Sequence, residues 1–257
     1  PLHEGFPAGN TMTMARQSQP QVSILVTRPK AEGEAFAAAL TARFGDRLRP
    51  VVTPLIAPRF LSAEVPAHDY AAVIFTSARA VEGARRLGMP LPRLAWCVGR
   101  KTAEVAVAAG FMAKSADGDA EALAEAIIVD PPDGRILYLR GVDTRGKLLE
   151  KLNSLGIYTD VASVYVQDPQ PLSDAALAIL RSPVPVVVPL FSPRTAGLFR
   201  AALPADAQAG LHLAAMSAAV AEAIETLPHT ALRVASRPDM SAMLDAVESL
   251  LADLPAP

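Results

Sequence analysis

The chain has 257 residues, of which 51% are hydrophobic, and its 24 basic and 26 acidic side chains give a net charge of −2. This length and composition allow one large domain or two smaller ones with a sizeable core. The near-zero charge argues against a protein that binds duplex nucleic acid, because such a protein needs a basic surplus. A local basic cluster that holds a small anionic ligand is still allowed.

The first twenty residues lack the apolar core of a signal peptide and show no periodic pattern. We therefore expect residues 1–20 to form a flexible tail, with Met12 and Met14 as candidate natural starts. The longest apolar stretches have the length of strands and are interrupted by proline or charge, so no transmembrane span is predicted. These features favour a cytoplasmic protein.

The first predicted unit is a strand followed by a helix. Residues 22–27 (VSILVT) form a buried-strand pattern, and residues 29–45 form a helical one. Pro29 suits the first helical position, and Gly45 is a natural C-terminal stop. The residues expected on the buried face are Phe36, Leu40 and Phe44.

Similar units follow along the chain. Further strands are predicted at 71–75, 94–98, 135–139, 184–191, 211–216 and 232–235, with a short one in GFMAKS (110–115). Each is followed by a helical stretch or a turn. This alternation implies an α/β architecture with mostly parallel sheets that are covered on both faces.

The second half of the chain resembles the first. A strand, an arginine, a loop, a helix and a glycine occur in order at 24–45 and again at 136–156, with Arg28 and Arg140 at matching positions. Extended stretches follow, at 49–60 and 160–171. The remaining pairs are FTSARAV with FSPRTAG and WCVGRKTAEVAVAAG with AAMSAAVAEAIETL. Self-similarity on this scale predicts two homologous α/β units rather than a solenoid.

Hydroxyl side chains recur where predicted strands pass into helices. In parallel α/β sheets this is the ligand-binding edge. Ser77 and Ser192 are N-cap candidates, and Pro193 strengthens the second case. The recurring residues are Thr76, Ser77, Lys101, Thr102, Ser192 and Ser217. A serine before a helix is usually only a cap, but the recurrence in both halves predicts two surfaces suited to a ligand with many anionic groups.

Several motifs that mark known catalytic or nucleotide-binding sites are absent from the sequence. It contains no G-x-G-x-x-G turn, no G-x-x-x-x-G-K-[ST] loop and no G-x-S-x-G elbow. The single cysteine, Cys97, has apolar neighbours that favour a buried thiol over a nucleophile. The four histidines show no ligand spacing, so no metal site is predicted. Any catalysis is expected to use few ionisable groups.

Taken in order, the motifs resemble those of the uroporphyrinogen-III synthase family. The matching stretches are ILVTRP, FTSARAV, CVGRKTAE, ILYLRGVDTRGKLLEKLNSLGI, VASVYVQDP, FSPRTAG and AAMSAAVAEAI, which together span about residues 22–250. No single stretch is decisive, and the ordered set is more specific than any of its members.

The resemblance implies a fold of two similar, flavodoxin-like α/β domains with parallel sheets, joined by two extended β linkers, with the active-site cleft between the domains. The implied boundaries are residues 21–52 plus 168–257 for domain 1, 53–60 and 161–167 for the linkers, and 61–160 for domain 2.

The resemblance also implies a reaction. Members cyclise the linear tetrapyrrole hydroxymethylbilane to uroporphyrinogen III, with loss of water, a spiro intermediate and inversion of ring D. No metal or organic cofactor is implied. The partner is the small-molecule substrate, supplied by the preceding enzyme of tetrapyrrole biosynthesis, with no nucleic acid or membrane, and the protein is expected to be a monomer.

The implied site residues follow from the matching stretches. Tyr165 is the expected catalytic residue, which assists departure of the substrate hydroxyl as a proton or hydrogen-bond donor; its alternative role is that of a half-buried strand tyrosine. The residues expected to bind substrate carboxylates are Thr76, Ser77, Thr102, Ser192, Ser217, Arg28, Arg140 and Arg145. Each arginine could instead be solvated or weakly paired. The chain departs from some members at MSAAV, where they have a Gly-Pro-Thr-Thr-like turn, and at His212, where they have lysine.

Two other functions stay open. A non-catalytic, two-domain protein that binds or senses a small anion would fit two α/β lobes, although no DNA-binding helix-turn-helix is visible. A nucleotide-dependent transferase is weakened by the missing phosphate loops.

Overall fold

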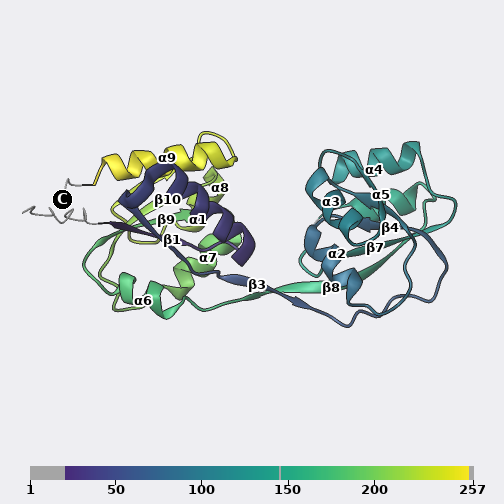
Figure 1. Cartoon of the computed structure of the whole chain (residues 1–257), viewed down its shortest axis with the longest axis horizontal. Coiled ribbons are helices and arrows are strands. Elements are labelled where there is room, and N and C mark those ends of the chain that lie inside the picture. Colours follow the sequence, from purple (N-terminus) through teal and green to yellow (C-terminus); the bar gives the residue numbers. More distant parts are fainter. Residues whose placement is uncertain (1–20, 145, 255–257) are drawn as a thin grey trace, which may run out of the picture. The chain divides into compact units, whose positions relative to one another are not determined.

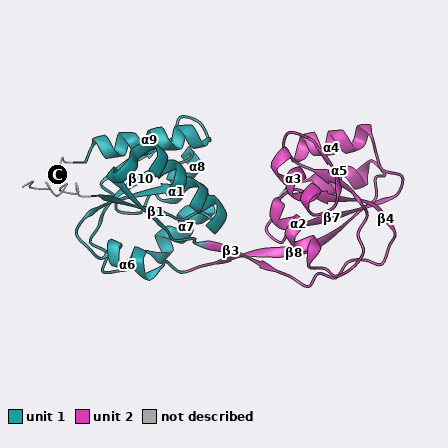
Figure 2. Ribbon diagram, in the orientation of Figure 1, with its two compact units in different colours: residues 1–55, 171–257 teal, residues 56–170 magenta. Residues whose placement is uncertain are grey.

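The computed structural model describes residues 21–144 and 146–254, so the predicted tail at 1–20 lies outside the described residues. The chain divides into two compact units (Figure 2). Of the described residues, unit 1 holds 21–55 and 171–254, and unit 2 holds 56–170. Each unit has its own sheet and its own hydrophobic core.

In the described part of unit 1, five parallel strands form a sheet in the order β11-β10-β9-β1-β2. The strands are β1 (Val22–Val26), β2 (Leu48–Val52), β9 (Pro185–Leu190), β10 (Gly210–Ala215) and β11 (Ala231–Val234). One face packs against α1 (Lys30–Phe44) and α9 (Met240–Ala252). The other packs against α6 (Asp174–Leu180), α7 (Pro193–Ala202) and α8 (Ala218–Ala223) (Figure 1).

The described residues of unit 2 form a six-stranded sheet in the order β3-β8-β7-β4-β5-β6. The strands are β3 (Ile56–Phe60), β4 (Tyr70–Phe75), β5 (Leu94–Cys97), β6 (Met112–Ser115), β7 (Arg135–Gly141) and β8 (Thr159–Pro169). Helices α2 (Ala78–Arg85) and α3 (Arg100–Ala108) contribute to the core on one face, and α4 (Ala120–Val129) and α5 (Leu148–Ser154) to that on the other. All neighbouring pairs are parallel except β3 with β8.

The two sheets share one strand order. Read from its β2 end, unit 1 runs β2-β1-β9-β10-β11. Unit 2 runs β8-β7-β4-β5-β6 in the same way, and its additional strand β3 lies next to β8. The paired positions, such as β1 with β7 and β9 with β4, are the strands whose sequences resemble each other. The prediction of two similar α/β units with parallel sheets is therefore confirmed.

Most local signals lie where the sequence predicts them. Phe36, Leu40 and Phe44 are buried on α1, and Gly45 ends the helix with a φ of +56°, which suits a residue without Cβ. The prediction for Pro29 is wrong by one position. Its ψ of 148° is extended, so it is the N-cap residue and Lys30 begins the helix.

Strand β8 changes partners along its length. Its first half pairs in parallel with β7, and Tyr165–Pro169 pairs antiparallel with β3. Between these regions the register shifts, because Arg140 is opposite Ser163 while Gly141 is opposite Tyr165. Val164 is thus an extra residue, as in a β-bulge. The bulge places Tyr165 on the side of the sheet that carries α2.

Two residues discussed above belong to the core. Cys97 is buried, and burial raises the pKa of its thiol to about 11, so it is protonated at neutral pH. The prediction of a buried thiol is confirmed. His212 is buried within β10, and burial lowers its pKa.

Across the described ranges, no helix is both long enough and apolar enough to cross a membrane.

Candidate functional site

The carboxyl ends of strands β4, β5 and β7 of unit 2 lie at the same level of the sheet. Phe75 on β4 is in register with Cys97 on β5 and with Leu139 on β7. The residues that follow these three positions therefore lie along one edge of the sheet, at the carboxyl ends of its parallel strands. We call this the unit 2 edge. The predicted residues at this edge are Thr76, Ser77, Thr102, Arg140 and Tyr165.

Tyr165 and Ser77 meet at the unit 2 edge. The Tyr165 hydroxyl lies 3.1 Å from Ser77 Oγ, which also accepts a hydrogen bond from the backbone N–H of Ala80 as the N-cap of α2. Only 7% of Tyr165 is exposed. The ring packs on the backbone of Gly141, where a Cβ would lie 2.6 Å from Cζ of Tyr165. The glycine leaves the space in which the ring lies.

A second tyrosine reaches the same turn. The Tyr138 hydroxyl lies 3.2 Å from Thr76 Oγ1, and its ring is buried. Burial raises the pKa of Tyr138, while the hydrogen bond to Thr76 and the charge of Arg140 act in the opposite direction. Sequence reasoning missed this residue. The feature of the sequence that could have indicated it is its position two residues before Arg140 on a predicted strand, because residues i and i+2 of a strand lie on the same face.

Arg140 lies over the Tyr138 ring, with Cζ 5.7 Å from the ring centroid. Its Nε atom is buried and has no hydrogen-bond partner within the described residues. Thr102, the third residue of α3, is mostly buried, and Gly99 is the N-cap of that helix. The remaining arginine of the prediction, Arg145, lies outside the described residues.

The unit 1 edge is the corresponding edge of the other sheet and carries Arg28, Ser192 and Ser217. Ser192 is the N-cap of α7, with Pro193 in the first helical position as predicted. Its Oγ accepts from the backbone N–H of Thr195. Ser217 is the N-cap residue of α8 but makes no side-chain cap hydrogen bond, and this helix has only six residues.

Arg28 is held at the unit 1 edge by an aromatic side chain. Its Cζ lies 4.2 Å from the centroid of the Phe191 ring, which in turn packs edge-to-face on Phe36 at 4.9 Å. The ring attracts the guanidinium and fixes its position beside the strand end, and an arginine fork is a group that can bind carboxylates.

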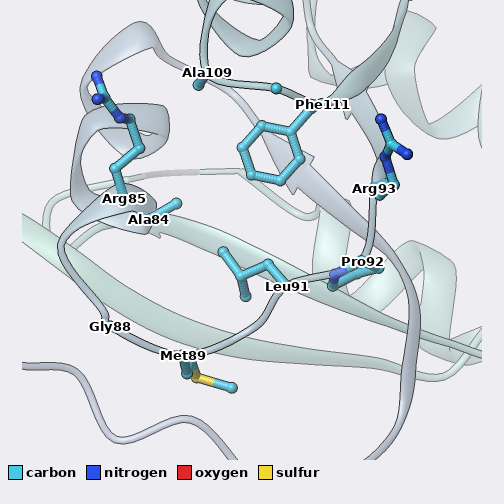
Figure 3. Close-up of a pocket in the computed structure, with 10 residues that line it drawn as sticks. Ala84, Arg85, Gly88, Met89, Leu91, Pro92, Arg93, Ala109 and Phe111 are labelled. Atoms are coloured by element: carbon cyan, nitrogen blue, oxygen red, sulfur yellow. The ribbon is translucent and has the colours of Figure 1, made fainter.

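A separate hollow opens in unit 2 (Figure 3). Its volume is about 260 Å³, and it lies where α2 and α3 end and β5 and β6 begin. Its lining residues are Ala84, Arg85, Gly88, Met89, Leu91, Pro92, Arg93, Ala109, Gly110 and Phe111. This is the opposite edge of the sheet, so the hollow contains none of the predicted site residues.

The two edges carry groups that can bind an anionic ligand. They present hydroxyls, helix N-termini and arginine side chains, all of which can donate hydrogen bonds to carboxylates. Tyr165 adds a phenol that can donate a proton. Among the described residues, no group of three or more His, Cys, Asp or Glu side chains could hold a metal ion.

Comparison with known proteins gives one family. The family model described as uroporphyrinogen-III synthase HemD matches residues 34–245. No curated protein matches the chain. The solved structure of uroporphyrinogen-III synthetase from Helicobacter pylori 26695 is 17% identical over 90% of this chain and 100% of its own, with a TM-score of 0.58. A mutant uroporphyrinogen III synthase from the extremely thermophilic bacterium Thermus thermophilus is 18% identical over 91% and 100%, with a TM-score of 0.47. The likeness to the Helicobacter pylori structure shows a shared fold.

Proposed function

Because the chain belongs to the uroporphyrinogen-III synthase HemD family, we propose that it cyclises hydroxymethylbilane to uroporphyrinogen III in tetrapyrrole biosynthesis. The observation that carries this proposal is the unit 2 edge, where the Tyr165 hydroxyl meets Ser77 at 3.1 Å beside Thr76 and Arg140. A phenol that can donate a proton thus lies beside groups that can bind carboxylates.

The first chemical step is departure of the terminal hydroxyl of the substrate. Tyr165 donates a proton to this oxygen, which leaves as water. The lone pair of the pyrrole nitrogen displaces the water, and the pyrrole N–H proton passes to the Tyr165 phenolate, which gives a neutral, electrophilic azafulvene. The N-cap position of Ser77 fixes its Oγ, which can donate its hydrogen to the Tyr165 oxygen and so leaves the phenol hydrogen for the substrate.

The second step is ring closure. The substituted carbon of ring D attacks the azafulvene carbon and gives a spiro intermediate, whose rearrangement inverts ring D. The linear substrate closes on its own to the type I isomer, so the protein must favour the folded pose that leads to type III. Orientation of bound reactants supplies several kcal/mol without strong acids or bases.

Carboxylate binding is assigned to both edges. The substrate carries eight carboxylates, and we assign them to Thr76, Ser77, Thr102 and Arg140 of unit 2 and to Arg28, Ser192 and Ser217 of unit 1. Helix N-termini and arginine forks are suited to this task. Arg145, which follows β7 in the sequence and lies outside the described residues, is a further candidate. We propose that the protein acts as a monomer and without a cofactor.

The test is to give purified protein freshly prepared hydroxymethylbilane and to separate the oxidised products by isomer. Excess type III over a heat-denatured control is the expected result. Type I alone, formed at the rate of the control, would overturn the proposal. Binding of the tetrapyrrole without a change in isomer ratio would favour a non-catalytic anion-binding protein instead.

A further inference from the structure

Two tyrosines on opposite faces of one sheet reach consecutive residues of one turn. Tyr165 packs in the core that contains Phe75 and Ala80, whereas Tyr138 packs in the core that contains Ile74 and Trp96. The Tyr165 hydroxyl lies at Ser77 and the Tyr138 hydroxyl lies at Thr76. The turn between β4 and α2 is thus held from both faces.

Tyr138 also supports Arg140. The two residues are neighbours on one face of β7, and the guanidinium carbon lies 5.7 Å from the Tyr138 ring centroid. The ring is 2% exposed and fixed in the core, so it is a rigid platform for the guanidinium. A buried donor without an acceptor is unfavourable, and Arg140 Nε is such a donor within the described residues. An anionic ligand would supply the missing acceptor.

The direction of the hydrogen bond between the Tyr138 and Thr76 hydroxyls is compatible with binding of an anionic ligand. A carboxylate only accepts hydrogen bonds, so Thr76 must donate its hydroxyl hydrogen to it. Thr76 Oγ1 can then accept from the Tyr138 hydroxyl at 3.2 Å. The tyrosine therefore orients the threonine as a donor.

We propose that Thr76 and Arg140 bind one carboxylate of the tetrapyrrole and that Tyr138 is the positioning residue of this subsite, through its hydroxyl for Thr76 and its ring for Arg140. The inference rests on the proposed function for the identity of the ligand. It assigns Tyr138 to substrate binding, whereas Tyr165 acts on the reacting hydroxyl.

The test compares Tyr138→Phe, Thr76→Val and the double variant. Loss of the tyrosine hydroxyl is expected to raise KM for hydroxymethylbilane about fivefold with kcat within twofold of the original protein. Because Tyr138 acts through Thr76, the double variant should have the KM of Thr76→Val alone. The matched control is Tyr158→Phe, which removes a hydroxyl from a tyrosine that is 62% exposed and should leave KM unchanged.

Binding of uroporphyrinogen III to the same variants separates this inference from the proposed function. Its Kd should rise by the same factor in Tyr138→Phe even if the protein proves not to catalyse ring closure. Three results would each overturn the positioning role. In Tyr138→Phe these are an unchanged KM and Kd, or a fall in kcat alone. In the double variant it is a KM raised by the product of the factors for the two single variants. If Tyr138→Phe does not fold, an unchanged Kd in Thr76→Val overturns the subsite.

Discussion

Tyr165→Phe is expected to lower kcat for hydroxymethylbilane about 100-fold or more, because a positioned proton donor contributes at least that factor. The ring stays in its place on Gly141, so the fold is retained and the unfolding free energy should change by about 1 kcal/mol. Initial rates of type III formation and urea unfolding of the same preparation measure the two effects.

Tyr158→Phe is the matched control for Tyr165→Phe, since it removes the same group from an exposed position. It should keep the full rate. A Tyr165→Phe protein that turns over at the original rate would contradict the proton-donor role and leave Tyr165 as a strand residue that packs the end of β7.

Gly141→Ala is expected to damage both the site and the stability. The new Cβ would lie 2.6 Å from Cζ and 2.9 Å from the hydroxyl oxygen of Tyr165, so the ring must move. Overpacking of this kind costs about 1–3 kcal/mol of unfolding free energy. The displaced hydroxyl leaves Ser77, and kcat should fall toward the value of Tyr165→Phe.

Gly197→Ala is the control for this substitution, because nothing lies within 4 Å of its Cβ position. On α7 it should leave kcat unchanged and raise stability by up to about 1 kcal/mol. Introduced into Tyr165→Phe, Gly141→Ala should lower kcat no further, since both changes act on one hydroxyl. A kcat of the double variant that falls below that of Tyr165→Phe by the same factor as Gly141→Ala causes alone would contradict this account of Gly141.

The sequence was sufficient for features that depend on local chemistry. Apolar runs predicted the strands, and the N-cap roles of Ser77 and Ser192 followed from a hydroxyl placed before a helical pattern. The internal repeat predicted two similar units, which the matching strand orders confirm. These features need only neighbours along the chain.

Other features depend on register between strands. The bulge at Val164, which sets the side on which Tyr165 lies, leaves no mark in a run of β-branched and aromatic residues. The need for glycine at position 141 follows from the tyrosine packed against it. Tyr138 is a core residue whose hydroxyl also contacts Thr76, and its position in the sequence gives no sign of this contact. Contacts made across strands cannot be read from periodicity alone.

Hydrogen exchange of backbone amides with and without uroporphyrinogen III tests the central claim, that the carboxyl edges of the two sheets bind the tetrapyrrole. The account predicts slower exchange at residues 76–80 and 100–103 of unit 2 and at 192–196 of unit 1, where strands end and helices begin. Slower exchange confined to residues 88–93 and 109–111, which line the hollow at the opposite edge, would contradict it.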